Sequence, residues 1–372
     1  MSAFPRVALI HDYLAQNGGA ERVLKAMQNI WPEAPTYTLF YDARLLPAFK
    51  GHELRTSFLQ HAPFVQTKYQ WYLALMPAAT ESYDLSAFDI VISNCSAFSK
   101  GVITRPDALH VSYCHTPTRY LWSDTHSYIR ELPIPAPIKW ILPPVLSSLR
   151  VWDREASERV DRFVANSQTV AKRIWKYYRR ESHVIHPPID TNLFSVRTAP
   201  KDYYLTGGRL VPYKRFDLPI RACNRLKLPL KIFGTGPIEK ELLSLAGPTI
   251  EFVGRVTDEK RSELFAGCKA FLHPQEEDFG ITPVEAMASG RPVIAYGVGG
   301  TLETVVDGVT GAFFYEQNWE TLADLLLRFD ETVYDPEKIR AHALCFGAER
   351  FQNELHSFVE NLWKTQAHAH LH

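Results

Sequence analysis

The sequence lacks any apolar run long enough to form a membrane-spanning helix, which takes about 20 apolar residues in succession. Its first residues, MSAFPRVALIHDY, have neither the charged flank nor the long apolar core of a secretory signal, and they lead directly into a strand pattern. These absences predict a cytoplasmic protein. Any membrane contact is expected to be peripheral, at the inner face of the cytoplasmic membrane.

Cysteine is scarce, and the sequence has no excess of charge of either sign. The five cysteines are scattered without Cys-x-x-Cys spacing, so we expect neither a disulfide framework nor a structural metal site. Forty-one Lys and Arg residues balance 41 Asp and Glu residues, which gives a formal net charge of zero. Without an overall positive field, the sequence does not predict a nucleic-acid partner.

Length and hydrophobic content are sufficient for two folded cores. The chain has 372 residues, of which 46% are hydrophobic and 22% are charged. Short apolar runs alternate with helical patterns along most of the chain, which is typical of an α/β protein with parallel sheets. The prolines of HPPIDTNLF predict a linker near 187–200. We therefore expect two doubly wound, Rossmann-like domains, over 1–190 and 200–348, each with its ligands at the carboxyl ends of the strands.

The segment EEDFGITPVEAMASG, residues 276–290, places two carboxylates eight positions apart across a glycine turn. A helix that begins just after Gly280 has unpaired N–H groups and the positive end of its dipole at that point, where a diphosphate or a sugar hydroxyl can bind. Glu277, before the turn, is expected to face a sugar. Glu285, one helical turn in, is expected to accept hydrogen bonds from ribose hydroxyls. The alternative interpretation is a capped surface helix with acidic residues near its N-terminus.

A second segment, YYLTGGRLVPYKRFD at 203–217, supplies two cations after a strand. Arg209 can form a forked pair with phosphate oxygens, and Lys214 can place a point charge beside a second phosphate. Gly207 and Gly208 permit the tight turn before them. Because two side-chain cations can neutralise a leaving diphosphate, no metal or other cofactor is predicted. A solvated basic turn is the competing interpretation.

Two loops in the N-terminal half complete the pattern. NGGAERV at 17–23 leads into a helix through Gly18 and Gly19, where the backbone can approach a phosphate. The alternative is an ordinary tight turn between a strand and a helix, and Glu21 reads as a first-turn acid rather than a catalyst. In YCHTPTRYLW at 113–122, His115 follows a strand, at the carboxyl end where sites form. His115 is expected to form a hydrogen bond with the donor sugar or to help orient the acceptor.

These four motifs together resemble the retaining GT-B glycosyltransferases of family 4, also called glycosyltransferase group 1, whose E-x7-E signature matches Glu277 and Glu285. The resemblance spans nearly the whole chain. It implies two Rossmann-like domains with parallel sheets that face a central cleft, an acceptor side in 1–190 and a nucleotide-sugar side in 200–348. It also implies that the C-terminal helix, at about 349–366, packs back on the first domain.

The resemblance assigns a role to each candidate residue. The expected catalytic residues are His115, Arg209, Lys214 and Glu277. The expected donor-binding residues are Gly18, Gly19, Gly208, Arg209, Lys214, Glu277, Phe279, Gly280, Ile281 and Glu285. The expected acceptor-side residues are Arg119, Tyr120 and Trp122, for which core or surface packing is the alternative.

The loop at 113–122 looks most like that of bacterial mannosyltransferases of surface-polysaccharide assembly, such as lipopolysaccharide synthesis. The predicted function is therefore retaining transfer of a hexose, with GDP-mannose favoured as donor, to a glycan or lipid-linked saccharide. Front-face attack is preferred over a double displacement on Glu277. Three alternatives stay open: another donor of the UDP-glucose type, a sugar-nucleotide 2-epimerase, and a non-catalytic sugar-nucleotide-binding subunit. Residues that pack the base are expected around 234–236 and 253–256.

Two segments of the N-terminal half, at 57–77 and 134–152, combine aromatic and aliphatic residues with isolated Lys or Arg. This mixture suits a surface that lies on a membrane, which would fit a lipid-linked acceptor. Two buried helices with proline-marked ends are the competing interpretation.

Overall fold

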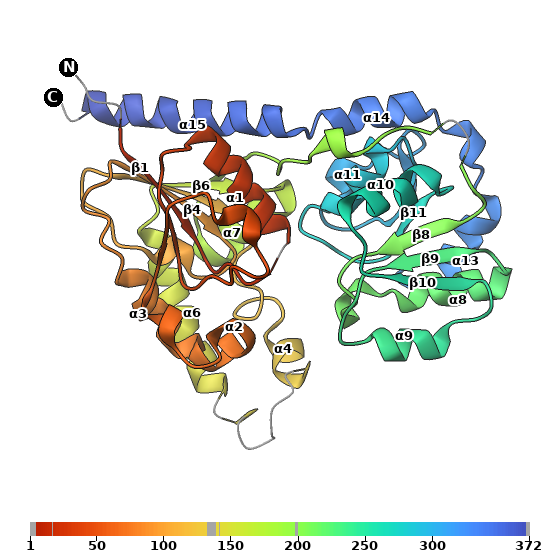
Figure 1. Ribbon diagram of the computed structural model, residues 1–372, viewed down its shortest axis with the longest axis horizontal. Coiled ribbons are helices and arrows are strands. Elements are labelled where there is room, and N and C mark those ends of the chain that lie inside the picture. Colours follow the sequence, from red (N-terminus) through yellow and green to blue (C-terminus); the bar gives the residue numbers. More distant parts are fainter. Residues whose placement is uncertain (1–4, 17, 132–138, 141, 198–199, 370–372) are drawn as a thin grey trace. The chain divides into compact units, whose positions relative to one another are not determined.

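The computed structural model describes residues 5–16, 18–131, 139–140, 142–197 and 200–369. The chain divides into two compact units (Figure 1). Unit 1 comprises Met1–His186 together with Phe351–His372, and unit 2 comprises Pro187–Arg350. Each unit contains its own parallel sheet with helices packed against both faces, which confirms the predicted α/β class.

The sheet of unit 1, within the described residues, has the strand order β3-β2-β1-β4-β5-β6-β7, and every neighbouring pair is parallel. Its strands are β1 Val7–His11, β2 Thr36–Thr38, β3 Leu54–Thr56, β4 Ile90–Cys95, β5 Leu109–Cys114, β6 Arg162–Ala165 and β7 Ser182–Val184. The central strands are the apolar runs that the sequence predicts. The short strands β2 and β3 were not predicted, because TYT and LRT contain no apolar run.

The helices of unit 1 cover both faces of this sheet (Figure 1). They are α1 Gly19–Ile30, α2 Val65–Lys68, α3 Met76–Glu81, α4 Thr125–Glu131, α6 Leu142–Glu158, α7 Gln168–Tyr178 and α15 Ala348–Ala369, with 3-10 turns at Pro47–Phe49, Phe58–His61, Tyr69–Leu75 and Ser99–Gly101. Phe351, Leu355 and Val359 of α15 share one core with Leu24 of α1 and Ile92 of β4. The C-terminal helix thus packs on the sheet of unit 1 from Phe351 onward, while α7 packs on the opposite face against β5 and β6.

The sheet of unit 2 has the order β10-β9-β8-β11-β12-β13 over the described part of the chain, again all parallel. Its strands are β8 Tyr204–Gly207, β9 Leu230–Phe233, β10 Ile250–Gly254, β11 Phe271–His273, β12 Val293–Tyr296 and β13 Gly311–Phe314. Because β8 lies beside β11, the loops that follow these two strands leave the sheet at neighbouring points. The topology therefore brings together two motifs that are about 70 residues apart in the chain.

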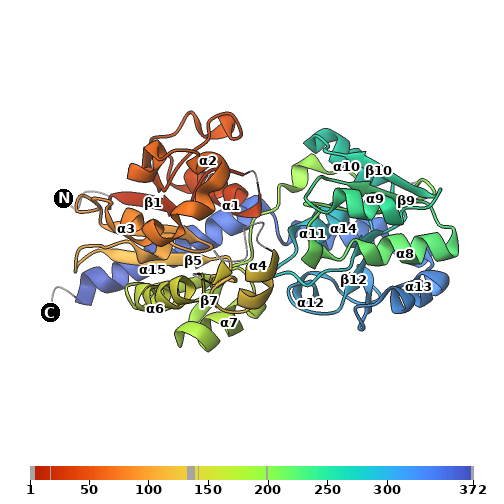
Figure 2. The same cartoon turned by 90° about the horizontal axis from the view of Figure 1, so that it is seen from below.

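Two helical layers enclose the sheet of unit 2 (Figure 2). The helices are α8 Asp217–Leu226, α9 Glu239–Leu245, α10 Asp258–Gly267, α11 Ile281–Ala288, α12 Thr301–Thr304, α13 Trp319–Arg328 and α14 Pro336–Leu344, with 3-10 turns at Thr191–Leu193, Pro212–Lys214 and Glu331–Val333. Helices α8, α9 and α13 share one core with the sheet, and α10, α11 and α14 share the other. Among the helices described in both units, none combines the length and the apolar character needed to cross a bilayer.

Candidate functional site

An ion pair joins the two predicted motifs of unit 2. Lys214 ends the 3-10 turn after β8, and its Nζ lies 3.0 Å from Oε1 of Glu277 in the loop after β11. The two side chains are 13% and 21% exposed, so the pair is mostly but not completely shielded from solvent. Arg209 belongs to the same loop as Lys214, is exposed, and makes no ion pair with any residue that the structure describes. The charge of Lys214 is therefore compensated by Glu277, whereas the charge of Arg209 is not compensated by a described residue.

Two glycines with positive φ shape the backbone around this pair. Gly208 has φ +136°, and a Cβ at this position would lie 3.3 Å from Nζ of Lys214. Gly280 has φ +91° and is the N-cap of α11, which begins at Ile281 as predicted. A side chain is strained at either backbone conformation, and Gly280 leaves the first N–H groups of α11 without a covering side chain. Both turns thus place backbone rather than a side chain beside the charged groups, although Gly280 itself is buried.

The loop that carries Glu277 is held by backbone contact with a second glycine pair. The N–H of Gly300 donates to the carbonyl oxygen of Glu277 over 2.8 Å. A Cβ on Gly300 would lie 2.3 Å from Cα of Phe279, and one on Gly299 would lie 2.6 Å from the carbonyl oxygen of Glu277. Since both contacts are with backbone atoms, no side-chain rotation relieves them. The loop after β12 therefore fixes the position of the loop that carries Glu277.

The protonation states of this pair follow from its surroundings. Burial acts to raise the pKa of Glu277, but the ammonium of Lys214 and the nearby His273 outweigh it and hold that pKa at about 2. Burial acts to lower the pKa of Lys214, and the Glu277 carboxylate outweighs it, so that this pKa is raised. At neutral pH Glu277 is therefore a carboxylate that accepts hydrogen bonds, and Lys214 is a cation.

The remaining predicted residues of this segment are more buried than the sequence suggests. Glu285 is 3% exposed, and its Oε1 lies 3.3 Å from Nη2 of Arg261, a partner that the sequence does not reveal. The ring of Phe279 lies in the core against Phe346, so that a ligand can reach only its backbone. Ile281 packs partly against the same core.

His273, at the end of β11, is a further polar group that sequence reasoning missed. It is fully buried, and within the described residues neither ring nitrogen has a hydrogen-bond partner. Its Nε2 lies 3.9 Å from the position of a Cβ on Gly280. Burial lowers the pKa of His273 to about 4, so the ring is neutral behind the N-terminus of α11.

In unit 1, the predicted glycine and histidine loops converge at the carboxyl ends of β1, β4 and β5. Gly18 is the N-cap of α1 and Gly19 its first residue, while Asn17 lies outside the described residues. His115 directly follows β5, and its Nε2 lies 2.6 Å from Oδ1 of Asn94, the next-to-last residue of β4. Asn94 was not predicted.

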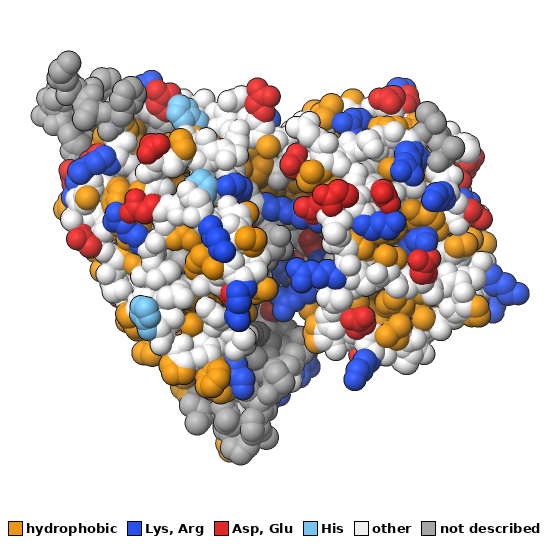
Figure 3. Space-filling model, viewed as in Figure 1, with side chains coloured by type: hydrophobic (Ala, Val, Ile, Leu, Met, Phe, Trp, Pro, Cys, Tyr) orange, Lys and Arg blue, Asp and Glu red, His pale blue; other side chains and the backbone are white. Residues whose placement is uncertain are grey.

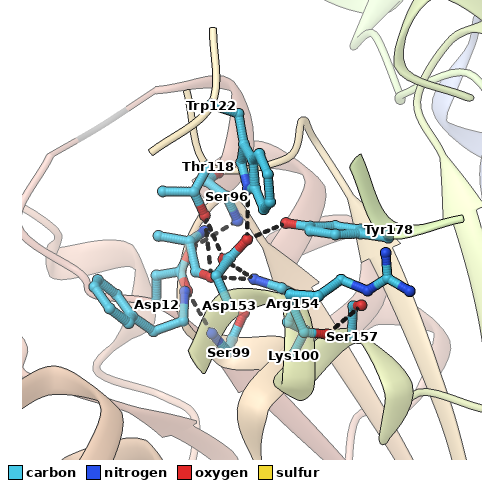
Figure 4. Close-up of polar contacts among 12 residues, drawn as sticks. Asp12, Ser96, Ser99, Lys100, Thr118, Trp122, Asp153, Arg154, Ser157 and Tyr178 are labelled. Carbon is cyan, nitrogen blue, oxygen red and sulfur yellow. Dashed lines mark hydrogen bonds and ion pairs between the residues drawn. The ribbon is translucent and has the colours of Figure 1, made fainter. Parts of the chain in front are cut away.

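The predicted acceptor-side loop is tied to a buried ion pair (Figure 4). Lys100 and Asp153 are each 1% exposed in their side chains, with Nζ 2.6 Å from Oδ1. Asp153 also accepts hydrogen bonds from Thr118 Oγ1 at 2.9 Å, Trp122 Nε1 at 2.8 Å and Tyr178 Oη at 2.8 Å. Trp122 is thus anchored by its indole nitrogen.

The other two predicted acceptor-side residues, Arg119 and Tyr120, lie in the same loop. Nη1 of Arg119 lies 4.0 Å from Oδ2 of Asp124. Tyr120 is partly buried and packs against the cluster that contains Leu121 and Leu146. This cluster links the loop to α6.

The segment 57–77 is partly buried and partly exposed. Leu59, Val65 and Leu73 are buried in a cluster with α6. Phe64 and Trp71 are 68% and 63% exposed, and Nζ of Lys68 lies 4.5 Å from the centre of the Trp71 ring. Figure 3 shows hydrophobic side chains interspersed with Lys and Arg over this end of unit 1. The segment 134–152 is described only at 139–140 and from Leu142 onward.

Comparisons with known proteins match both units. The model of the family "Glycosyltransferase Family 4" matches residues 17–193, and that of "Glycosyl transferases group 1" matches residues 191–341. Over 329 residues the chain is 26% identical to the alpha-1,3/1,6-mannosyltransferase ALG2 of Dictyostelium discoideum, covering 75% of this chain and 73% of that protein. It is also 30% identical over 215 residues to the D-inositol 3-phosphate glycosyltransferase of Mycobacterium leprae, a match that spans half of each chain.

Solved structures support the same assignment at the level of fold. The structure of Anabaena Alr3699/HepE in complex with UDP and glucose superposes with a TM-score of 0.71 at 19% identity, covering 96% of this chain and 99% of that one. With two parallel Rossmann-like sheets and two matching family models that together span residues 17–341, the chain belongs to the group 1, family 4 glycosyltransferases and has the GT-B fold.

Proposed function

We propose that this glycosyltransferase transfers a hexose from a nucleoside diphosphate sugar to a saccharide or lipid-linked acceptor, with retention of the anomeric configuration. GDP-mannose is the favoured donor, because the 113–122 loop resembles that of mannosyltransferases and ALG2 is a mannosyltransferase. The observation that carries the proposal is the Lys214–Glu277 pair beside Arg209 and the N-terminus of α11.

Each group in this arrangement has a defined chemical task. As the bond between the anomeric carbon and the diphosphate oxygen breaks, negative charge grows on the phosphate, and Arg209 and Lys214 stabilise it. Glu277 is ionised and accepts hydrogen bonds from hydroxyls of the transferred sugar. The acceptor oxygen attacks from the face that the diphosphate leaves, and its proton passes to a phosphate oxygen. This route needs neither a metal ion nor a covalent intermediate, and isolation of a glycosyl adduct on Glu277 would overturn it.

A UDP-sugar donor is the second candidate. The observation in its favour is the Anabaena structure, which was solved with UDP and glucose. In this proposal the Lys214–Glu277 site binds the diphosphate and the sugar, and the base is expected near 234–236 and 253–256. Gly234 and Gly236 pack against the backbone of the loop that carries Arg209, so base recognition and diphosphate binding share one scaffold.

The donor is tested by incubating the purified full chain with labelled GDP-mannose, UDP-glucose and UDP-N-acetylglucosamine, and by measuring transfer and slow hydrolysis. We expect turnover of GDP-mannose that persists in excess EDTA. Turnover of UDP-glucose alone selects the second candidate. An absolute requirement for a divalent metal, or the absence of turnover with every donor, contradicts the proposal.

A peripheral membrane contact through unit 1 completes the proposal, on the basis of the exposed aromatic residues near Lys68. Trp71 and Phe64 present apolar surface, and Trp140 is 84% exposed. In flotation with vesicles that contain anionic phospholipid, we expect the wild type to float and the Phe64→Ser/Trp71→Ser variant to remain at the bottom. A matched pair of changes in unit 2, Val309→Ser/Leu302→Ser, serves as control because both residues are exposed there. Absence of wild-type flotation removes this part of the proposal.

A further inference from the structure

A line of buried polar side chains runs from α1 to His115 in unit 1. Oε1 of Glu21 lies 3.7 Å from Nε2 of His11, and Nδ1 of His11 lies 3.1 Å from Nδ2 of Asn94. Oδ1 of Asn94 then lies 2.6 Å from Nε2 of His115. Glu21, His11 and Asn94 are each no more than 3% exposed. Buried polar groups of this kind are ordered by their hydrogen bonds, so the direction of each bond matters.

The amide of Asn94 has only one orientation that satisfies its neighbours. Its Nδ2 lies 2.8 Å from the carbonyl oxygen of Ala20, which can only accept a hydrogen bond. The amide nitrogen must therefore face Ala20 and His11, and the amide oxygen must face His115. Because an amide oxygen only accepts, Nε2 of His115 must carry a proton. In the neutral ring, Nδ1 is then the acceptor, and no described residue is hydrogen-bonded to it.

At the other end of the line, the contact between His11 and Glu21 is longer than a hydrogen bond. Nδ1 of His11 accepts from Asn94, so the proton of a neutral His11 is on Nε2, which faces Glu21. The second oxygen of Glu21, Oε2, accepts from the N–H of Gly18 at 2.8 Å. The carboxylate is thereby anchored to the N-cap of α1, where the helix dipole favours it. Glu21 thus has a second role beside that of a first-turn acid.

We propose that Glu21, His11 and Asn94 are positioning residues that hold His115 in the tautomer with its proton on Nε2 and present Nδ1 as an acceptor to a substrate hydroxyl. This inference rests on the proposed function in one respect, that His115 contacts a substrate. A hydroxyl can donate to Nδ1, whereas a phosphate oxygen or a carbonyl cannot. The line of bonds therefore selects the chemical class of group that His115 meets.

The charged and titratable groups that face His115 are His11 and Asp12 at the end of β1 and Glu21 in α1. The two oxygens of Asp12 already accept four backbone N–H groups, of Ser96, Ala97, Phe98 and Ser99, at 2.7–2.9 Å. Burial lowers the pKa of His115 to about 4, and His11 acts in the same direction. The ring is therefore neutral at pH 7, where the choice of tautomer has its effect.

Histidine tautomers are measured directly by NMR of the full chain labelled with nitrogen-15 in histidine, with His115→Gln used to assign the signal. At pH 7 we expect the proton of wild-type His115 on Nε2. In Asn94→Asp, which has the same shape, a carboxylate replaces the whole amide. The hydrogen bonds to Ala20 and His11 are lost, and His115 should take up its second proton about 1 pH unit or more higher. The acid limb of kcat/KM should move upward with it. Asn318→Asp is the matched control, because Asp caps α13 as well as Asn does.

A wild-type proton on Nδ1, or an Asn94→Asp variant with an unchanged His115 titration, overturns the inference. Glu21→Gln is a second variant that retains an oxygen for the Gly18 N–H, so the fold should persist and the tautomer of His11 can be read in the same spectrum. The tautomer is read without turnover, so loss of the proposed function alone would leave it unaffected. Adding a sugar nucleotide, and separately its nucleoside diphosphate, tests the donor as the hydroxyl source. A change at Nδ1 with the sugar nucleotide alone identifies the donor sugar, and no change excludes it.

Discussion

Replacement of Asp153 by alanine should destabilise unit 1 severely. The carboxylate is the common acceptor for Lys100, Thr118, Trp122 and Tyr178, and it is almost completely buried. Without it, the hydrogen-bond partner that remains to the Lys100 ammonium among the described residues is the carbonyl oxygen of Ala97, at 2.6 Å. Breaking a buried ion pair by removing one partner costs about 3–5 kcal/mol. That is a large part of the roughly 5–15 kcal/mol that holds a typical domain together.

Urea unfolding followed by tryptophan fluorescence measures this loss, because seven of the eight tryptophans, all except Trp319, belong to unit 1. Glu158→Gln is the control on the same helix, since its pair with Arg154 is exposed and should contribute below about 1 kcal/mol. The double variant Lys100→Met/Asp153→Leu should recover part of the loss, because no charge remains buried, while Thr118, Trp122 and Tyr178 still lose their acceptor. An Asp153→Ala variant within about 1 kcal/mol of the wild type would refute the reasoning.

Three further results are expected in unit 2. Gly300→Ala should displace the Phe279 backbone, which should lower turnover at least about tenfold and stability by about 1–3 kcal/mol. The control Gly51→Ala should change neither, because a Cβ at Gly51 would have no atom within 4 Å. The pKa of Glu277 is lowered from 4.5 to about 2, so its ionised form stabilises the fold above pH 4.5, and up to about 3 kcal/mol is lost as the pH falls towards 2. In acid unfolding, the stability of Glu277→Gln should not show this loss between pH 4.5 and pH 2. A stability curve that matches that of the wild type would contradict the prediction. Glu285→Ala should reduce turnover at least about tenfold in steady-state assays, and wild-type rates would count against its role.

The sequence predicted those parts of the fold that depend on local patterns. The apolar runs that became β1, β4, β5 and β8, and the glycine before α11, each carry their signal within a few residues. The predicted positions of Lys214 and Glu277 follow from this, because parallel strands place their following loops at one edge. The domain boundaries and the roles of the individual site residues stay predictions.

The unpredicted parts depend on contacts between distant residues. His11 and Asn94 are 83 positions apart, and Lys100 and Asp153 are 53 positions apart. No spacing rule connects such pairs, and each residue alone reads as an ordinary strand or helix position. The strand β2 was missed for a different reason, since three residues supply too little periodicity to be recognised.

Calorimetric titration of GDP and of UDP into the purified chain tests the diphosphate site most directly. We expect at least one of them to bind the wild type, and Lys214→Ala and Arg209→Ala each to weaken that binding at least about tenfold, or roughly 1.4 kcal/mol. Arg225→Ala, which removes an exposed cation at the end of α8, should bind as the wild type does. Equal affinity in all four proteins, or no binding of either nucleotide, would contradict the assignment of this site.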